Sequence, residues 1–177
     1  MVNLIFETHA TSLDNEKSIS SGWSDVKLSS EGEQQAKRLG NRYRDRQIDA
    51  VFCSDLFRAV ETASIAFGQD PRKIFIDWRL RECNYGDFSK RPTDIVEPEK
   101  LKRIDVPFPG GESYRDCLAR TKSFLDDLKS MFDDKTVIVI GHAAPRHCLE
   151  HLIKGKSLKK ILSEEFKWQP GWEYELK

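Results

Sequence analysis

The sequence contains no long apolar run, no excess of charge of one sign and no closely spaced pair of cysteines. Its apolar segments fall short of the ~20 residues that a membrane-spanning helix needs. Lys and Arg together number 29 among 177 residues, as do Asp and Glu. The balance of charge therefore does not favour nucleic acid or a membrane surface as a partner. The four cysteines form no CxxC motif, which favours reduced thiols over a disulfide framework: Cys53, Cys83, Cys117 and Cys148.

The N-terminal stretch MVNLIFE lacks the basic flank and the long apolar region of a signal peptide. Together with the scattered cysteines, this leads us to expect a cytoplasmic protein. Hydrophobic residues make up 38% of the chain and charged residues 33%, a composition typical of a folded globular protein. The length suits a single domain over residues 1–177, and no linker divides it.

Strand-like and helix-like segments alternate along the chain. Strands are predicted at residues 2–8, 50–54, 73–77, 136–141 and 172–176, and helices at 29–46, 55–67, 112–132 and from about Pro145. The helix at 29–46 has a capping-box pattern, Ser30 followed by Glu33, and the next helix is expected to begin at Ser54 or Asp55. Residues 78–111 are rich in Pro, Gly and charge and are expected to be irregular. The alternation predicts an α/β fold, a three-layer sandwich with a mostly parallel central sheet.

Two apolar strands end in the same way, at a histidine followed by alanine. They are LIFETHATS, which contains His9, and VIVIGHAAP, which contains His142. Because the carboxyl ends of parallel strands meet at one edge of a sheet, both histidines are expected there. They would face each other if their strands are neighbours. The strand at 50–54 brings Arg58, in the following helix, to the same edge, and the irregular segment contributes Glu82.

These residue types are the parts of a phosphoryl-transfer site. Arginine side chains and the N–H groups at helix starts bind anions. A neutral imidazole can attack phosphorus and form a phosphohistidine. A protonated carboxylic acid can deliver a proton to the leaving alkoxide. The expected partner is therefore a small phosphorylated substrate.

At these residues the chain resembles the histidine phosphatase superfamily, which includes phosphoglycerate mutases and small acid and sugar phosphatases. The matching segments follow in order: THATSLDN, GWSDVKLSSEG, SDLFRAVETA, LRECNYGDF, PGGES and GHA. Each is short, and it is their common order over nearly the whole chain that carries the resemblance. The resemblance implies a phosphoglycerate mutase-like fold, and we expect neither a metal ion nor a cofactor.

The resemblance also implies a role for each site residue. His9 would accept the phosphoryl group and Glu82 would donate the proton. Arg58 and His142 would bind the phosphoryl group. The remaining positions would line the phosphate pocket or the substrate mouth: Asn15, the main chain of Ala143, and Trp23.

The chain departs from the family pattern around the histidine. The family's arginine before it is Thr8 here, and the family's glycine after it is Ala10. Loss of one strong oxyanion donor typically costs ~10²–10³ in rate. Arg146, in the first turn of the helix after His142, is the candidate replacement. Thr8 is then expected to face the phosphate pocket and Glu7 to point away, since side chains alternate along a strand.

Two functions of other classes stay open at this point. The stretch HCLEH (147–151) fits the H-x-x-E-H pattern of some zinc proteases, although no obvious third ligand segment follows. A non-catalytic phosphate-binding or regulatory protein, its chemistry weakened by Thr8, is the second. Within the family, the short chain favours a phosphatase over a mutase, because mutases of this type are longer. The sequence indicates neither the substrate nor the oligomeric state.

Overall fold

Five strands form the central sheet in the order β4-β3-β6-β1-β7, in a computed structural model that describes residues 1–69 and 74–177. The strands are β1 (Val2–Thr8), β3 (Ala50–Cys53), β4 (Ile74–Ile76), β6 (Thr136–Gly141) and β7 (Trp172–Leu176). All neighbouring pairs are parallel except β1 and β7, which pair antiparallel at one edge. The predicted α/β fold with a mostly parallel sheet is confirmed. Of the third predicted strand, Lys73 lies outside the described residues.

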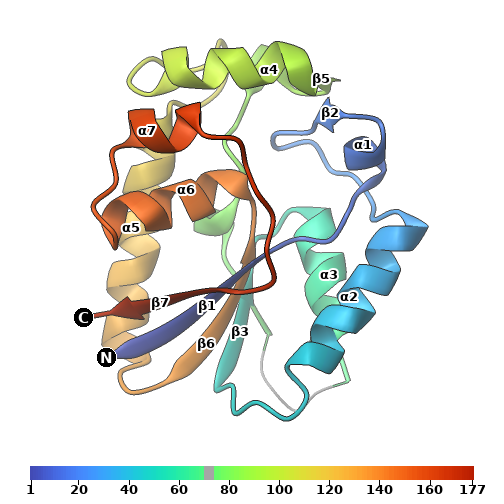
Figure 1. The fold of residues 1–177 in the computed structure, drawn as a ribbon, viewed down its shortest axis with the longest axis vertical. Helices are drawn as coiled ribbons and strands as arrows, with labels where there is room; N and C mark the ends of the chain where they lie inside the picture. Colours follow the sequence, from blue (N-terminus) through green and yellow to red (C-terminus); the bar gives the residue numbers. More distant parts are fainter. Residues whose placement is uncertain (70–73) are drawn as a thin grey trace.

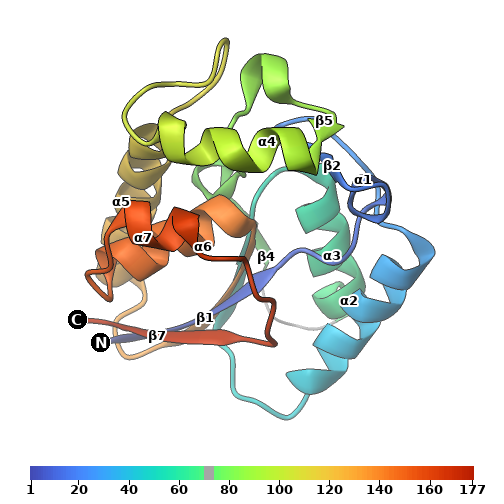
Figure 2. The same cartoon turned by 45° about the horizontal axis from the view of Figure 1, so that its top comes forward.

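Helices cover both faces of this sheet (Figures 1 and 2). The longer ones are α2 (Ser30–Arg42), α3 (Phe57–Phe67), α5 (Tyr114–Met131) and α6 (Ala143–Leu152). On one face α2 and α3 pack against alternate strand residues such as Ile5 and Ile138. On the other face α5 and α6 pack against Phe6 and Val139. Because side chains alternate along each strand, the strands are apolar on both faces, which explains their continuous apolar runs.

Shorter elements lie beyond the carboxyl ends of the strands. They are α1 (Leu13–Glu16), β2 (Ile19–Ser20), β5 (Arg91–Pro92), α4 (Thr93–Lys100) and α7 (Leu158–Ser163), with single 3₁₀ turns at Trp78–Leu80, Gly86–Phe88 and Leu101–Arg103. β2 and β5 pair as a separate two-stranded sheet, with α4 following β5 at the top of the view in Figure 1. None of the helices in the described part of the chain has both the length and the apolar character that a membrane span requires.

Several helices begin at other residues than the sequence pattern predicted. The N-cap of α2 is Ser29, whose hydroxyl accepts from the N–H of Gly32, so the capping residue is not Ser30. Helix α3 begins at Phe57 rather than at residue 54 or 55, because Leu56 keeps extended backbone angles.

Two further corrections concern prolines. Helix α6 begins at Ala143, two residues before Pro145. This is possible because a proline in the first turn removes no intrahelical hydrogen bond. Helix α4 lies inside the segment expected to be irregular, where Pro98 interrupts the pattern typical of a helix.

The register of the sheet places both strand-end histidines side by side. β1 and β6 are adjacent and parallel, with Thr8 opposite Gly141. The N–H of His9 donates to the carbonyl of Gly141 at 2.9 Å and extends this pairing by one residue. Position 141 also needs a glycine, since a Cβ there would approach the ring of Phe6 to 2.9 Å. The two strands therefore deliver His9 and His142 to the same point.

Candidate active site

The rings of His9 and His142 face each other at the carboxyl edge of the sheet. Their centroids are 4.9 Å apart and their planes are tilted by 53°. The sequence predicted this juxtaposition on the condition that the two strands are neighbours, and they are. The loops that follow β1, β3 and β6 surround the pair.

His9 is held as a neutral imidazole with one unprotonated ring nitrogen. Its Nδ1 lies 2.7 Å from the carbonyl oxygen of Ala10, which can only accept, so Nδ1 carries the hydrogen. Nε2 then carries the lone pair, and it accepts from Nε of Arg58 at 3.2 Å. Burial, followed by the positive charge of Arg58, lowers the pKa of His9 to about 3. A neutral ring with an unprotonated nitrogen is the form that acts as a nucleophile.

His142 is fully buried and fixed by a serine. Its Nε2 lies 2.6 Å from Oγ of Ser54, and Ser54 Oγ accepts from the N–H of Leu56 at 3.4 Å. The hydroxyl has one hydrogen and a second acceptor position, so its role toward Nε2 depends on the tautomer of His142. When the hydroxyl donates to Nε2, the ring hydrogen lies on Nδ1. Among the described residues Nδ1 has no hydrogen-bond partner. Burial, then the charge of Arg58, lowers the pKa of His142 well below its usual value.

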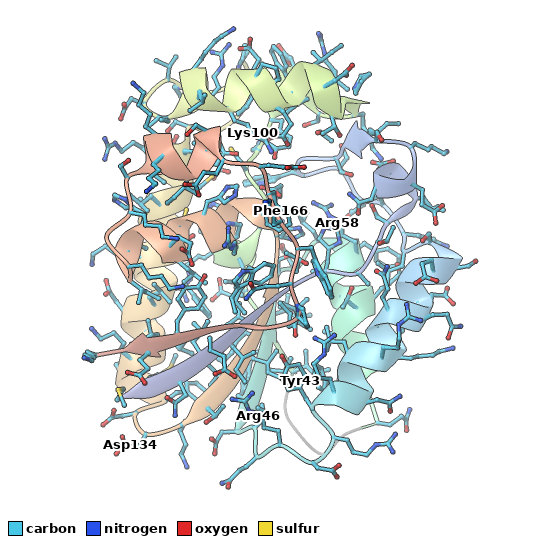
Figure 3. The ribbon with its side chains drawn as sticks, viewed as in Figure 1. Tyr43, Arg46, Arg58, Lys100, Asp134 and Phe166 are labelled. Atoms are coloured by element: carbon cyan, nitrogen blue, oxygen red, sulfur yellow. The ribbon has the colours of Figure 1, made fainter. Side chains whose placement is uncertain are left out.

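Arg58 brings a buried positive charge to the histidine pair. Its side chain lies beyond the ends of the strands, near the top of α3 (Figure 3). Its terminal nitrogens donate to the carbonyl oxygens of Ser24 and Gly22, at 3.1 and 2.9 Å. No carboxylate forms a salt bridge with it in residues 1–69 and 74–177. Burial lowers the pKa of Arg58. A buried guanidinium without a carboxylate partner is well suited to receive an anionic ligand.

The carboxyl group of Glu82 lies next to the start of α6. Its Oε1 accepts from the N–H groups of Cys83 at 2.8 Å and Ala144 at 3.1 Å. Both hydrogen bonds of the carboxyl group in the described part of the chain use Oε1, which leaves Oε2 available for a ligand. The carbonyl oxygen of Glu82 accepts from Nε1 of Trp23 at 2.6 Å. The structure therefore brings Trp23 to Glu82. The guanidinium carbon of Arg81 lies over the Trp23 ring, 4.5 Å from the ring centroid.

Asn15 and Ala143, which the resemblance assigns to the phosphate pocket, have different surroundings. Asn15 is exposed and belongs to the capping box of α1, where its Oδ1 accepts from the N–H and the hydroxyl of Ser12, each at 2.9 Å. The amide nitrogen of its side chain is the group left for a ligand. Ala143 is the first residue of α6, whose N-cap is His142, so its N–H lies at the positive end of the helix dipole.

Thr8 is half-buried and lines a cavity of about 470 Å³ between the end of β1 and α2. Glu7 lines the same cavity, and its side chain lies on the face of the sheet that packs against α2, the face that Ile5 also shares. Glu7 is buried, and its Oε1 accepts from Arg42 and from the hydroxyl of Tyr43, each at 2.6 Å. Two partners from α2 and its C-cap hold this carboxylate in the interior, and strand alternation did not predict them.

The structure does not bring Arg146 to His9. Its guanidinium lies against two aromatic rings, 5.0 Å from the centroid of Trp172 and 5.7 Å from that of Phe166. It lines a separate cavity beside α7, together with His147. This placement disagrees with the expectation that Arg146 stands in for the family arginine. Arg58 is the guanidinium that contacts His9 in the described residues.

The residues of the HCLEH stretch do not converge on a common point. Glu150 is ion-paired with Lys154 at 3.0 Å and Lys156 at 2.6 Å. Nδ1 of His151 donates to the carbonyl oxygen of Lys156 at 2.7 Å. His147 is buried against aromatic rings. This arrangement gives no support to a zinc protease site.

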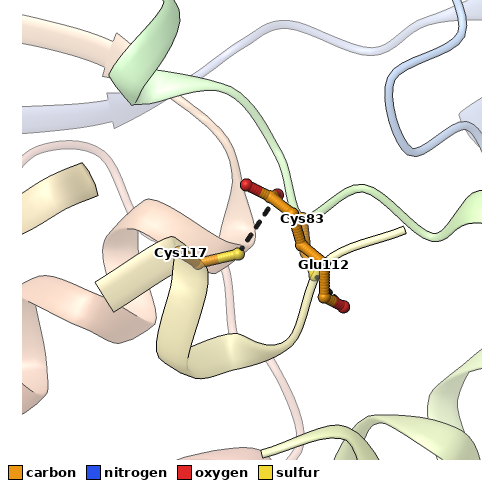
Figure 4. A group of neighbouring side chains, drawn as sticks. All are labelled: Cys83, Glu112 and Cys117. Atoms are coloured by element: carbon orange, nitrogen blue, oxygen red, sulfur yellow. Dashed lines mark hydrogen bonds between the residues drawn. The ribbon is translucent and has the colours of Figure 1, made fainter. Parts of the chain in front are cut away.

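A different group has metal-ligating atoms close together, namely Cys83, Glu112 and Cys117 (Figure 4). The three ligand atoms lie within 4.8 Å of one another. A guanidinium is already bound there, because Arg120 donates to both carboxylate oxygens of Glu112, at 2.9 and 3.1 Å, and to Sγ of Cys117 at 3.3 Å. Its positive charge makes the group an ion-pair site rather than a cation site.

Sequence reasoning missed three features of this site. Ser54 was recognised only as a strand end, and nothing in its neighbourhood predicted the contact with His142. The main-chain carbonyls of Gly22 and Ser24 accept hydrogen bonds from Arg58. Every residue has such a carbonyl, so residue type did not predict these contacts. The pairing of Glu112 with Arg120 was also missed, although Glu112 belongs to the PGGES segment that the resemblance included.

Comparison with known proteins identifies the family of this chain. The model of the histidine phosphatase superfamily (branch 1) matches residues 4–169, and the chain belongs to this superfamily. A 2,3-bisphosphoglycerate-dependent phosphoglycerate mutase of Staphylococcus epidermidis is 31% identical over 216 aligned residues, covering 99% of this chain and 95% of the relative. Phosphoserine phosphatase 1 of Hydrogenobacter thermophilus is 30% identical over 176, covering 92% and 81%.

Solved structures show the same fold. YhfR of Bacillus stearothermophilus superposes with a TM-score of 0.85 at 25% identity, covering 95% of this chain and 87% of that one. A mycobacterial glucosyl-3-phosphoglycerate phosphatase superposes with a TM-score of 0.80 at 23% identity, covering 91% and 86%. The expected phosphoglycerate mutase-like architecture is thereby confirmed, and the chain is a histidine-type enzyme of the phosphatase and mutase class.

Proposed function

We propose that this protein is a phosphomonoesterase that hydrolyses a small phosphorylated metabolite through a phosphohistidine on His9. The observation that carries the proposal is the state of His9. Its Nδ1–H is fixed by Ala10, its Nε2 lone pair is directed to Arg58, and its pKa of about 3 keeps the ring neutral at physiological pH. A histidine with a purely structural role has no need of a lone pair directed toward an unpaired buried cation.

The residues divide the reaction into two balanced steps. In the first, Nε2 of His9 attacks phosphorus, the ester P–O bond breaks, and the proton on Oε2 of Glu82 passes to the departing oxygen. In the second, water attacks the phosphohistidine, the P–N bond breaks, and Glu82 takes up the proton of that water. Phosphate leaves and both side chains return to their starting state.

The phosphoryl oxygens would be held by donors that surround His9. Arg58 supplies a charged fork and His142 supplies its Nδ1–H, which is otherwise unpartnered in the described residues. The N–H of Ala143 and the side-chain amide of Asn15 complete the set. Thr8 contributes no charge, so Arg58 carries most of the electrostatic stabilisation of the transition state.

The shortness of this chain favours a phosphatase over a mutase. The Staphylococcus mutase aligns over 216 positions although this chain has 177 residues, so that relative has segments that this chain lacks. A mutase must retain a phosphorylated intermediate and exclude water from it, which a shorter chain with fewer covering segments does less well.

A panel of phosphate esters tests the proposed function. We expect measurable hydrolysis of p-nitrophenyl phosphate and of at least one small metabolite class, such as a phosphorylated amino acid, sugar or glycerate, with release of inorganic phosphate. Absence of turnover on the whole panel, with inorganic phosphate still bound, would favour the non-catalytic phosphate-binding protein. Transfer of the phosphoryl group to a second phosphoglycerate instead of to water would identify a mutase.

The low pKa of His9 predicts that the pH profile of kcat/KM has no acid limb near the ordinary pKa of histidine. His9 must be neutral to attack, and with a pKa of about 3 it becomes protonated only as the pH falls toward 3, not around 6.5. We therefore expect kcat/KM to show no loss through histidine protonation between pH 7 and about 4.5. Two esters with different phosphate pKa values separate the substrate's own titration, because a limb that belongs to the substrate follows the ester.

An acid limb of the pH–rate profile near pH 6.5 that is the same for both esters would contradict the assignment of a low pKa to His9.

Burial of neutral His9 also makes the stability of the folded protein depend on pH. Between about 6.5 and 3 the unfolded chain binds more protons than the folded one, so the folded state loses stability as the pH falls through that range. Circular dichroism at each pH therefore accompanies the kinetics.

A further inference from the structure

A buried ion pair lies directly behind the segment that carries Glu82. Arg120, two turns into α5, has a side chain that is only 5% exposed, and Glu112 precedes the same helix with 15% exposure. They are joined by two hydrogen bonds, from Nε and from one terminal nitrogen of Arg120. Charges buried to this degree cost several kcal/mol unless their partners are well placed. The other hydrogen bonds of Arg120 and Glu112 show what this buried pair holds in place.

Arg120 uses its remaining donors on the main chain around Glu82. One terminal nitrogen donates to the carbonyl oxygens of Arg79 at 2.8 Å and Arg81 at 2.7 Å. The other donates to the carbonyl oxygen of Glu82 itself at 2.9 Å. A single planar guanidinium thus fixes three carbonyls of one short segment.

Glu112 holds the chain on the other side of Glu82. Its Oε2 accepts from the N–H of Asn84 at 2.9 Å, and its own N–H donates to the carbonyl oxygen of Asn84 at 2.9 Å. The thiol of Cys117 donates to the same carboxylate oxygen at 3.5 Å (Figure 4). The pair therefore forms hydrogen bonds with the main chain on both sides of Glu82, whose carboxyl group must reach the leaving oxygen.

We propose that Arg120 and Glu112 form a positioning pair that aims the carboxyl group of Glu82 at the leaving group. The proposal rests on the proposed function, since it assigns Glu82 the role of proton donor. Neither residue touches the substrate. Their effect is to restrict the main chain at Glu82, so that Oε1 stays on the N–H groups of Cys83 and Ala144 and Oε2 faces the reacting ester. Proton transfer is sensitive to such placement because the donor must lie within hydrogen-bond reach of the leaving oxygen.

The test uses the different needs of two leaving groups. p-Nitrophenolate departs without a proton, whereas the alkoxide of glycerol phosphate needs one. For Glu112→Gln and Arg120→Lys we expect kcat/KM for glycerol phosphate to fall about 10–100-fold, and kcat/KM for p-nitrophenyl phosphate to change less than about threefold. A merely structural role would lower both values together.

A double-mutant comparison adds a second readout. If the pair acts only through Glu82, then adding Glu112→Gln to Glu82→Gln should cause no further loss on glycerol phosphate beyond about twofold. Arg115→Gln is the matched control, because Arg115 is an exposed arginine on the same helix that pairs with Asp105. It should leave both activities unchanged.

Equal losses on the two esters, or a further tenfold loss in the Glu82→Gln background, would overturn the proposal. Urea unfolding of each variant shows which ones fold, and Glu112→Asp, which keeps the charge, replaces a variant that does not. If the unsubstituted protein hydrolyses no ester of the panel, the proposed function fails. An alkyl phosphate of the panel takes the place of glycerol phosphate if the latter is not a substrate. If it hydrolyses both and the variants keep its leaving-group preference, only the positioning role fails.

Discussion

His9→Ala is expected to lower kcat/KM by at least ~10³-fold while leaving the fold intact, because removal of a nucleophile eliminates the covalent route altogether. The side chain is half-buried at the end of β1 and belongs to none of the hydrophobic clusters of the core. The measurement is steady-state hydrolysis of p-nitrophenyl phosphate, with thermal unfolding monitored in parallel.

His151→Ala serves as the matched control for that substitution. His151 lies on α6, where its ring bonds to the carbonyl of Lys156, away from the histidine pair. We expect its removal to change kcat/KM less than about twofold. Activity of His9→Ala above about a tenth of the unsubstituted enzyme would mean that another group accepts the phosphoryl.

Arg58→Gln is expected to lower kcat/KM by ~10²–10³-fold or more, the usual cost of one strong oxyanion donor in a site that excludes water. The loss should lie at the upper end, because Thr8 supplies no second charge beside His9. Inhibition by inorganic phosphate should weaken in the same variant, since the guanidinium binds the product as well. Hydrolysis rates and phosphate inhibition constants are the quantities to compare.

A second substitution distinguishes charge from packing at this position. Thr8→Arg in the Arg58→Gln background should restore part of the lost rate, because a guanidinium at residue 8 could reach the same phosphoryl oxygens. Recovery of phosphate inhibition should accompany the recovery of rate. Retention of more than about a tenth of the activity by Arg58→Gln alone would show that the principal cation of the site lies elsewhere.

The pair of strand-end histidines could be predicted from the sequence because it depends on a short-range pattern and on one general rule. An apolar run that stops at a histidine shows where a buried strand ends, and parallel strands end at the same edge. His9 and His142 therefore needed only the adjacency of β1 and β6 to meet. Arg58 was predictable for a similar reason, since it follows the adjacent strand β3 by a few residues.

The position of Arg146 could not be predicted in this way. Its helix turn was correct, but the direction of its side chain is decided by rings from a distant part of the chain, Phe166 and Trp172. A long flexible side chain at a helix start can reach in several directions, and cation–π contacts of ~0.5–2 kcal/mol are enough to select one. Residue spacing contains no information about such tertiary partners.

The environment of Glu82 could not be predicted from the sequence either. The carboxyl group itself lies in a recognisable segment, but its support comes from Arg120 and Glu112, which are 38 and 30 residues further along the chain. Main-chain carbonyls accept most of these hydrogen bonds, and every residue has one. Helix α4 was hidden for a related reason, because its helical pattern is short and contains Pro98.

The most direct test of the account is single-turnover phosphorylation of the enzyme. The protein is mixed with a radiolabelled phosphate ester, quenched rapidly with base, digested and mapped by mass spectrometry. The account predicts a base-stable, acid-labile phosphoryl group on the peptide that contains His9, formed and lost at rates compatible with turnover and absent from His9→Ala. Turnover of the ester without any labelled peptide, or a label on a carboxylate or hydroxyl side chain, would contradict it.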